Sequence, residues 1–445
     1  MAKMPLDRAI ESELYTDDML ELQSAIHTDL LLNTQHSELE KMESDELRSL
    51  ALTFVERMLA DRSITLPRAM VERLADSVVS EVRGFGPLDV LLKDGSITEI
   101  MVNGLRQVMV ERDGRLRKCA VRFLNRQHIM RIVEKIISPL GRRLDESMPM
   151  VDARLPDGSR VNVIIEPLAI DGPYMTIRKF AVDALTDEDL LRFGTLNSKM
   201  RDFLKLCVEG KLNILISGGT GSGKTTTLNV LSSFIPHDER IVTIEDAAEL
   251  QLQQEHVIAL ESRPANLEGN GEITIRDLVR NSLRMRPDRI IVGEVRGGEA
   301  LDMLQAMNTG HEGSLSTVHT NSPRDCLSRL ETMVLMAGTE LPSSAIRQQI
   351  SNAVDMIVHQ DRMRDGSRVI THISEVQGME GEQIILQDLF KLERQGVDED
   401  EGVLVKHQSV GSQPHFVDKL AAEGVKLPAD MFLIDEDIRP RVVHW

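Results

Sequence analysis

The feature that most constrains this chain is one eight-residue segment, Gly218-Gly219-Thr220-Gly221-Ser222-Gly223-Lys224-Thr225. It matches the pattern G-x-x-x-x-G-K-[ST], in which glycines let successive backbone N–H groups converge on phosphate oxygens without obstruction by Cβ atoms. The lysine brings a positive charge to the β- and γ-phosphates, and the hydroxyl of the last residue completes the magnesium shell. The segment therefore predicts a loop that binds a nucleoside triphosphate together with Mg²⁺.

The residues on both sides of this loop support the prediction. The run Ile214-Leu215-Ile216 is typical of a buried strand, and a helix is expected to begin near Thr226. The positive end of that helix would face the bound phosphate. We therefore predict that Gly218 to Thr226 bind ATP and that Thr225 contacts the magnesium ion. The alternative is a glycine-rich turn that matches the pattern by chance.

Two further strand patterns end in carboxylates. The strand pattern at 289–293 is followed by Glu294, and the strand pattern at 241–244 is followed by Glu245. Because open α/β sheets bind ligands at the carboxyl ends of their strands, both side chains are candidates for the site. Glu294 is predicted to orient the attacking water and to contact magnesium, directly or through a water molecule. Glu245 is predicted to be a second catalytic group, with a purely structural role as the alternative.

The segment from Gly310 to Asn321 contains two histidines. His319 closes the strand pattern 315–318, in a sheet whose other strands end in the candidate groups, and this favours a sensor or phosphate-contact role. His311 comes before that strand, and two histidines eight residues apart are weak evidence by themselves. A buried, hydrogen-bonded histidine remains the alternative for both.

An arginine-rich stretch precedes the phosphate loop. Arginine makes bidentate contacts to phosphate, and a partner domain can supply one that completes a site when it closes. Arg154 and Arg178 are the leading candidates because they lie in or beside strand patterns, although most surface arginines have no such role. The whole set is Arg131, Arg142, Arg143, Arg154, Arg160 and Arg178, with Arg284, Arg286 and Arg296 after the loop.

The spacing of apolar residues divides the first half of the chain. Residues 1–40 are strongly acidic and are predicted to form a solvated, partly flexible arm; the first 50 residues hold 12 acidic and 4 basic side chains. Apolar residues recur at helical spacing in residues 41–85, which predicts a helical region. Residues 86–182 change to a two-residue repeat around one helix, which predicts a small α/β domain with hairpin turns at Asp113-Gly114 and Asp157-Gly158.

The second half begins with a predicted linker and hinge at 183–196. In residues 197–445 short apolar strands alternate with helices, which predicts a mostly parallel sheet covered on both faces. The fold class expected from the residues is therefore α/β, with a nucleotide-binding domain preceded by a small α/β domain and a helical region.

Composition excludes several classes of protein. The net charge is −19 and aromatic residues make up 3%, so neither a basic face for nucleic acid nor stacking platforms are expected. The cysteines, Cys119, Cys207 and Cys326, are too few and too scattered for a four-thiolate zinc site. The start of the chain lacks the apolar core of a signal peptide, and no run is long enough for a membrane-spanning helix. A cytoplasmic protein without zinc is expected.

The order of motifs resembles the type II/type IV secretion ATPase superfamily. The four segments 218–225, 244–250, 291–300 and 310–321 are similar to the boxes that this superfamily calls Walker A, Asp box, Walker B and His box. The resemblance covers roughly residues 85–445. Within the superfamily, residues 81–104 and 386–390 look most like the tight-adherence (Flp) pilus assembly ATPases of the CpaF type. The absence of a four-cysteine insertion agrees with a zinc-free branch.

This resemblance implies a RecA-like C-terminal domain in a hexameric ring. It also implies that nucleotide binds between this domain and the small α/β domain, with Arg154, Arg160 or Arg178 reaching it across the cleft. Closure at the hinge would drive an inner-membrane platform protein that adds or removes pilin subunits. The expected location is the cytoplasmic face of the inner membrane.

Two other readings remain open from the residues. A DNA translocase on the same nucleotide core would require a basic channel, which the acidic balance disfavours. A nucleotide-gated adaptor without turnover would not need Lys224, Thr225 and Glu294 together.

Overall fold

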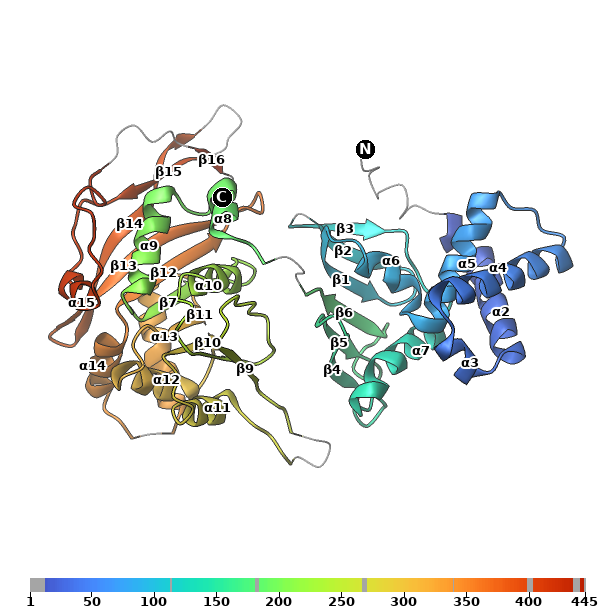
Figure 1. Cartoon of the computed structure of the whole chain (residues 1–445), viewed down its shortest axis with the longest axis horizontal. Coiled ribbons are helices and arrows are strands. Elements are labelled where there is room, and N and C mark those ends of the chain that lie inside the picture. The colour runs from blue at the N-terminus through green and yellow to red at the C-terminus, as the bar shows by residue number, and fades with distance from the viewer. Residues whose placement is uncertain are drawn as a thin grey trace. The chain divides into compact units, whose positions relative to one another are not determined.

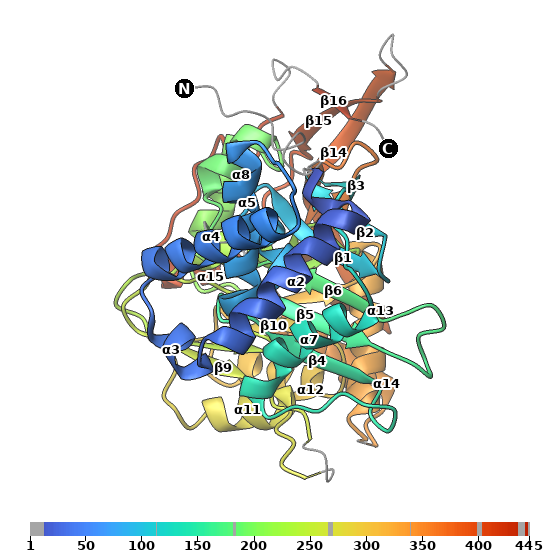
Figure 2. The ribbon, with the colours of Figure 1, turned by 90° about the vertical axis from the view of Figure 1, so that its right-hand side faces the viewer.

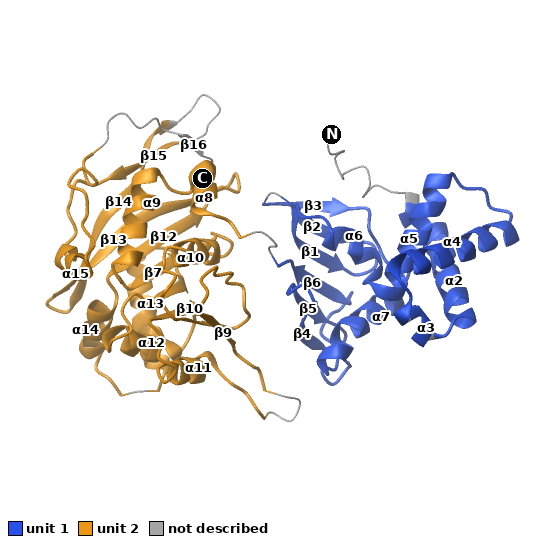
Figure 3. Cartoon of the chain, viewed as in Figure 1, with its two compact units in different colours: residues 1–182 blue, residues 183–445 orange. Residues whose placement is uncertain are grey.

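The computed structural model describes residues 13–112, 114–180, 184–265, 270–338, 340–397, 403–434 and 441–443. The chain forms two compact units, residues 1–182 and 183–445 (Figures 1 and 3). Asp113, the first residue of one predicted turn, lies outside the described residues. Every helix in the described parts of the chain is too short or too polar to cross a bilayer.

The first unit begins with a helical region (Figure 2). Its helices are α2 (Asp17–Asn33), α3 (His36–Lys41), α4 (Ser44–Asp61) and α5 (Arg68–Arg83), after a short 3-10 helix, η1 (Glu13–Tyr15). α2 begins at Thr16, whose side-chain oxygen accepts a hydrogen bond from the N–H of Met19. α5 begins directly after Pro67, which fixes the backbone ahead of the first turn.

Helix α2 corrects the expectation of a solvated arm for residues 17–33. Leu22, Ile26 and Leu30 recur at helical spacing and are buried in one core with α4 and α5. The acidic residues of α2, such as Asp18, lie on its exposed side. The charge balance predicts only that the acidic side is exposed, whereas the apolar stripe determines where the helix packs.

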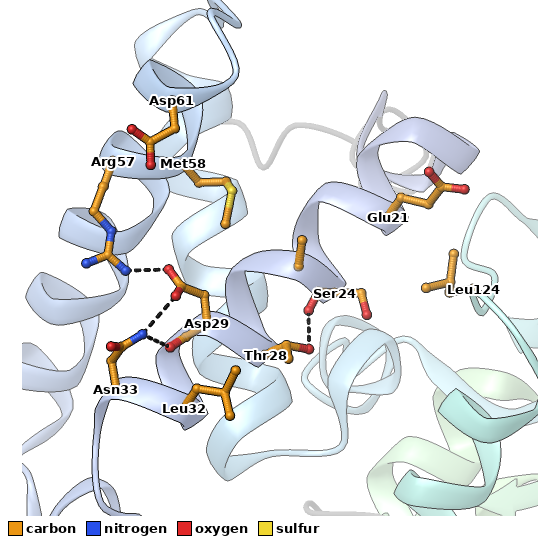
Figure 4. Close-up of a pocket in the computed structure, with 11 residues that line it drawn as sticks. Glu21, Ser24, Thr28, Asp29, Leu32, Asn33, Arg57, Met58, Asp61 and Leu124 are labelled. Carbon is orange, nitrogen blue, oxygen red and sulfur yellow. Dashed lines mark hydrogen bonds and ion pairs between the residues drawn. The ribbon is translucent and has the colours of Figure 1, made fainter.

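An open groove runs along the surface of this helical region (Figure 4). It is lined from α2 and α4, and an ion pair between Arg57 and Asp29 lies in it. Asn33 also donates a hydrogen bond to Asp29, from Nδ2 to Oδ1 at 2.8 Å. The carboxylate of Asp29 therefore joins the two helices across the groove.

The rest of the first unit is a six-stranded sheet in the order β3-β2-β1-β6-β5-β4, with every neighbouring pair antiparallel. Its elements are η2 (Gly86–Leu88), α6 (Asp89–Leu92), β1 (Ile97–Asn103), β2 (Val108–Arg112), β3 (Arg115–Cys119), α7 (Arg126–Ile137), η3 (Ser138–Leu140), β4 (Met150–Arg154), β5 (Arg160–Ile164) and β6 (Tyr174–Arg178). One face packs on the apolar side of α7, through residues such as Ile129 and Ile132. Because side chains alternate along a strand, the next residues face away from this core.

A buried carboxylate joins the helical region to α7. Glu81 of α5 accepts hydrogen bonds from His128 Nε2 at 2.7 Å, Arg131 Nη2 at 3.1 Å and Gln23 Nε2 at 3.4 Å. His128 Nδ1 accepts from the N–H of Leu124, which places the ring proton on Nε2. Burial acts to raise the pKa of Glu81, but the His128 hydrogen bond and the nearby cations outweigh it and lower the pKa. Arg131, a candidate phosphate ligand from the sequence, is thus bound to this carboxylate.

The same junction predicts an acid-sensitive stability. Burial lowers the pKa of His27 from 6.5 to about 4, with Glu81 opposing and Arg131, Lys135 and His128 reinforcing the shift. Between these pH values the unfolded chain binds a proton that the folded chain does not, so the unfolding free energy falls as pH falls. We expect a loss of up to about 3 kcal/mol from pH 6.5 to pH 4.

Denaturant unfolding followed by tyrosine fluorescence would measure this loss, because both tyrosines, Tyr15 and Tyr174, lie in the first unit. A Trp445→Phe background removes the competing emission. His27→Gln should flatten the pH dependence between pH 6.5 and pH 4.5. Below that range the depressed pKa of Glu81 adds a loss of the same sign in both proteins. An equal slope in the two proteins above pH 4.5 would contradict the assignment to His27.

The second unit is built on a ten-stranded sheet in the order β16-β15-β14-β13-β12-β7-β11-β10-β8-β9. The strands from β12 to β9 in this order are parallel, as the sequence predicts, and β13 to β16 extend the sheet with antiparallel pairs. The strands are β7 (Ile214–Gly218), β8 (Ile241–Glu245), β9 (Val257–Glu261), β10 (Arg289–Val295), β11 (Leu315–His319), β12 (Met356–Arg362), β13 (Arg368–Glu380), β14 (Gln383–Val397), β15 (Val403–Ser409) and β16 (Arg441–Val443).

Helices cover both faces of this sheet. Ile214 and Ile216 of β7 share one core with α9 and α10, and Leu215 faces a second core with α12, α13 and α14. The mixed α/β fold with a helical N-terminal region, predicted from the sequence, is confirmed. The helices are α8 (Asp187–Phe193), α9 (Ser198–Glu209), α10 (Lys224–Ser232), α11 (Ile275–Ser282), α12 (Glu299–Asn308), α13 (Pro323–Met336), α14 (Ser343–Ala353) and α15 (Val417–Ala422).

The predicted hinge at 183–196 is largely part of the second unit. Residues 187–193 form α8, which the Thr186–Asp189 capping box starts and Gly194 ends. Leu190 and Leu196 are buried in the core that contains β7. The apolar positions within this polar stretch are enough to hold it in place.

Candidate functional site

The phosphate loop leaves the carboxyl end of β7, the strand between β12 and β11 in the sheet. In this register Gly218 is paired with His319 of β11 on one side and with Gln360 of β12 on the other. Gly221 and Gly223 have φ angles of +68° and +94°, in the left-handed region that glycine adopts without strain. Helix α10 then begins at Lys224, with its N-terminal N–H groups at the end of the loop.

Lys224 folds back over this loop. Its Nζ donates a hydrogen bond to the carbonyl oxygen of Gly219 at 2.9 Å. Burial lowers the pKa of Lys224, with the charge of Glu294 acting in the opposite direction and Arg296 reinforcing it. A partly buried ammonium beside a ring of backbone N–H groups is suited to a multiply charged anion. Thr225 and Thr226 follow in the first turn of α10 and are half-buried.

Glu294 lies near the end of β10, two strands away from the loop. Its Oε2 is 2.6 Å from Nη2 of Arg296, and Nη1 of the same arginine is 3.4 Å from Oδ2 of Asp246. The hydrogen bond from Arg296 to Glu294, with burial opposing, raises the pKa of Arg296. Glu294 also acts on the pKa of Lys224 and His319, so its carboxylate lies within electrostatic range of both.

The two histidines of the His segment are separated by strand β11. His319 ends the strand and lies opposite Gly218, whereas His311 comes before the strand starts at Leu315. Burial, then the charge of Lys224, lowers the pKa of His319, with Glu294 opposing. Its ring is therefore neutral at pH 7, able to donate one hydrogen bond and accept another. Of the two histidines in this segment, His319 lies at the phosphate-loop edge and His311 does not.

Glu245, predicted from its position at a strand end to be a catalytic group, binds backbone N–H groups of the following loop. It ends β8 and its side chain is almost fully buried. Its Oε1 accepts hydrogen bonds from the N–H groups of Glu249 at 2.9 Å and Leu250 at 3.2 Å. The carboxylate therefore anchors the loop that follows β8. Its predicted catalytic role stays a prediction, and the geometry gives it a structural task as well.

Residues of β12 and β13 also contact the loop, on the side away from β11. Arg368 Nε donates to the carbonyl oxygen of Gly221 at 3.0 Å, and Thr227 Oγ1 donates to Gln360 Oε1 at 2.6 Å. His359 Nδ1 is 2.8 Å from Ser217 Oγ. These residues lie in or beside an ordinary apolar strand pattern, and no motif in the sequence marks them.

The candidate arginines of the first unit form a row across its sheet. Arg154 of β4 is paired with Arg160 of β5, which is paired with Arg178 of β6. All three are on the face turned away from the α7 core, because their neighbours Ala153, Val161 and Ile177 are buried. Like charges directly opposite one another on a sheet repel, so anionic groups near the row stabilise it.

Beyond Arg178 the row continues with an acidic side chain. Arg178 is paired with Glu99 of β1, and its Nε donates to Glu99 Oε1 at 2.9 Å. The other candidates of this stretch are elsewhere. Arg142 donates to the carbonyl oxygen of Asp152, and Arg143 is paired with Asp145.

The donor set at the loop fits a nucleotide with magnesium. Hydroxyl and carboxylate oxygens are the ligands that Mg²⁺ prefers, and Thr225 and Glu294 supply one of each. The glycine loop, the helix N-terminus and Lys224 supply the donors that phosphate oxygens require.

Comparisons with known proteins identify relatives of this chain. The chain is 37% identical over 308 residues to a putative conjugal transfer protein of Mycobacterium tuberculosis, covering 68% of this chain and 87% of that protein. It is 33% identical over 318 residues to the type IV secretion system protein VirB11 of Brucella suis, covering 65% of this chain and 88% of that protein. The crystal structure of that VirB11 ATPase with sulphate aligns at 30% identity and a TM-score of 0.36, covering 65% of this chain and 95% of the other. The model of the type II/IV secretion system protein family matches residues 81–388. The chain belongs to this family.

Proposed function

We propose that this protein is an ATP-hydrolysing motor of a secretion or pilus machine. The observation that carries the proposal is the meeting of three side chains at one edge of the second unit's sheet. Lys224 lies on the phosphate loop, His319 is paired with the first glycine of that loop, and Glu294 is near enough to shift the pKa of both. Membership of the secretion family gives the class of work that hydrolysis would drive.

The residues divide the reaction between them. The N–H groups of the loop and of Thr225 and Thr226 hold the β- and γ-phosphates, and Lys224 balances their charge. Glu294 accepts a hydrogen bond from the attacking water and aligns it with the γ-phosphorus. His319, neutral at pH 7, is placed to donate to a γ-phosphate oxygen and so to report its presence. Bound magnesium, held through Thr225 and Glu294, would supply charge neutralisation between the β- and γ-phosphates.

The arginine row is the proposed contribution of the first unit. Arg154, Arg160 and Arg178 lie side by side on the face of their sheet that is turned away from the α7 core. We infer, from the family resemblance, that these arginines contact the phosphates of the nucleotide only in a closed state of the protein, because guanidinium groups make bidentate contacts to phosphate. Release of these contacts after hydrolysis would then supply the conformational step of the motor.

The resemblance extends the proposal to the assembly. A homo-hexamer of the tight-adherence (Flp) pilus type would act on a platform protein of the inner membrane, from its cytoplasmic face, with ATP and Mg²⁺ and without zinc. The two rival functions remain a DNA translocase and an adaptor that binds ATP without turnover.

One set of measurements tests the proposal against its rivals. We expect ATP turnover with magnesium, a larger assembly on size-exclusion chromatography with ATP and magnesium than without, and no stimulation by DNA. Turnover that rises severalfold with DNA would support the translocase, and tight ATP binding without turnover the adaptor. A monomer under every condition would contradict the ring.

The same turnover assay tests the arginine row. Arg178→Ala should lower turnover at saturating ATP about 10-fold to 100-fold, because an arginine that acts only in the closed state stabilises the transition state. Arg192→Ala is a matched control, since Arg192 is an exposed arginine paired with Asp189 on α8. Equal turnover in the two variants would remove the row from the mechanism.

A further inference from the structure

The phosphate loop is supported by a strand hairpin on the side opposite to Glu294 and His319. β7 lies between β11 and β12, so the catalytic candidates lie on its β11 side and the β12–β13 hairpin on the other. The hairpin turn is closed by hydrogen bonds from Met363 N–H to the oxygen of Ser367 and from Gly366 N–H to the oxygen of Met363. It brings Arg362 and Arg368 into a directly opposed pair.

This hairpin covers the glycines of the motif closely. A Cβ on Gly218 would lie 2.1 Å from the carbonyl oxygen of Gln360, and one on Gly223 would lie 2.9 Å from Nε2 of Gln360 and 3.0 Å from Cδ of Arg368. Contacts below 3.0 Å force a neighbour to move. Gly218 is therefore required by the backbone of the neighbouring strand, and a side chain at position 223 would displace Gln360 or Arg368.

Three side-chain hydrogen bonds tie the loop to the hairpin. Arg368 binds the carbonyl oxygen of Gly221 in the middle of the loop. Before the loop, Ser217 is bound to His359, and after it Thr227 is bound to Gln360; all four of these residues are buried. The two ends of the loop are thus fixed in the protein interior, and Arg368, an exposed side chain, binds its middle.

The contact of Arg368 sets the direction of the neighbouring N–H groups. A peptide unit is planar, so fixing the carbonyl oxygen of Gly221 also fixes the N–H of Ser222 on the other side of that unit. Ser222 is buried, and its N–H donates to the carbonyl oxygen of Gly219 at 3.4 Å, the same oxygen that accepts from Lys224 Nζ. Gly221 by itself imposes little restriction on its backbone angles, so this peptide needs an external hold.

We propose that Arg368 is a positioning residue of the phosphate loop, and that the β12–β13 hairpin thereby sets nucleotide affinity. The proposal rests on the function proposed above. Arg368 acts through Gly221 on the loop that holds the β-phosphate, a group that ADP and ATP share. Its loss should therefore weaken both nucleotides by the same factor and leave the chemical step at saturation largely intact.

Calorimetric titration of the full chain with ADP and magnesium tests this, together with turnover at saturating ATP. Arg368→Ala should raise the Kd of ADP and the KM of ATP about tenfold, while kcat stays within threefold of the unchanged protein. Arg368→Lys should recover most of the affinity, because an ammonium group can also donate to the Gly221 oxygen. Arg364→Ala is the matched control, an exposed arginine in the same hairpin turn.

The outcomes separate this proposal from the function on which it rests. An Arg368→Ala protein that binds ADP as tightly as the Arg364→Ala protein would overturn the positioning role and leave the motor function intact. A fall of kcat as large as the rise in KM, with a lower melting temperature of the nucleotide-free protein, would show a general structural role and would also overturn it. Failure of the unchanged protein to bind ADP would instead overturn the proposed function.

Discussion

Lys224→Ala should abolish measurable ATP turnover and weaken ATP binding about 100-fold or more. The substitution removes the ammonium group that covers the loop and the charge that balances the β- and γ-phosphates. Charge-assisted contacts of this kind are worth roughly 1.5–3 kcal/mol each, and a lysine bridging two phosphates makes more than one.

The fold should tolerate this change. Burial lowers the pKa of Lys224, so the ammonium is partly desolvated in the nucleotide-free protein, and its removal should change the unfolding free energy by less than about 1 kcal/mol. Lys205→Ala is a suitable control, because Lys205 is an exposed lysine on α9. Turnover by the Lys224→Ala protein within tenfold of the control would remove the phosphate-loop assignment.

Glu294→Gln should separate binding from hydrolysis. The amide keeps the shape of the side chain but cannot accept the proton of the attacking water, so we expect turnover to fall about 10²- to 10⁴-fold. The Kd of ATP should stay within a few fold of the value for the unchanged protein, because Glu294 is not part of the phosphate loop. Arg296 loses one ionic partner and keeps Asp246 at 3.4 Å.

Two measurements make this prediction sharp. Single-turnover hydrolysis of bound ATP reports the chemical step directly, and titration with a non-hydrolysable analogue reports affinity. Glu312→Gln is the matched control, since Glu312 is exposed and precedes β11, at the edge opposite to the loop. Equal single-turnover rates in the two variants would show that another residue orients the attacking water.

The candidate site shows which features short sequence patterns can predict. Short apolar runs predict the strands that end at Gly218, Val295 and His319, and the parallel order of β7, β11 and β10 brings those ends to the same edge. Glu245 shows the limit of the same argument. The end of a strand locates a side chain at an edge, but the hydrogen bonds to Glu249 and Leu250 decide what that side chain does.

Residues 1–40 and 183–196 show a second limit. Both stretches hold more acidic than basic residues, and this excess predicts exposure. Apolar residues within them, such as Ile26 and Leu190, are buried against segments far away in the chain, and such long-range contacts leave no local signal beyond a short helical repeat.

The sequence by itself determined the phosphate loop, the parallel core strands and the family resemblance, because each depends on residues that are neighbours in the chain. Only the tertiary structure decided that three arginines form a row across β4, β5 and β6, and that Arg368 reaches a loop almost 150 positions earlier. Strand pairing fixes these relations, and it depends on packing over the whole sheet, which the local sequence does not encode.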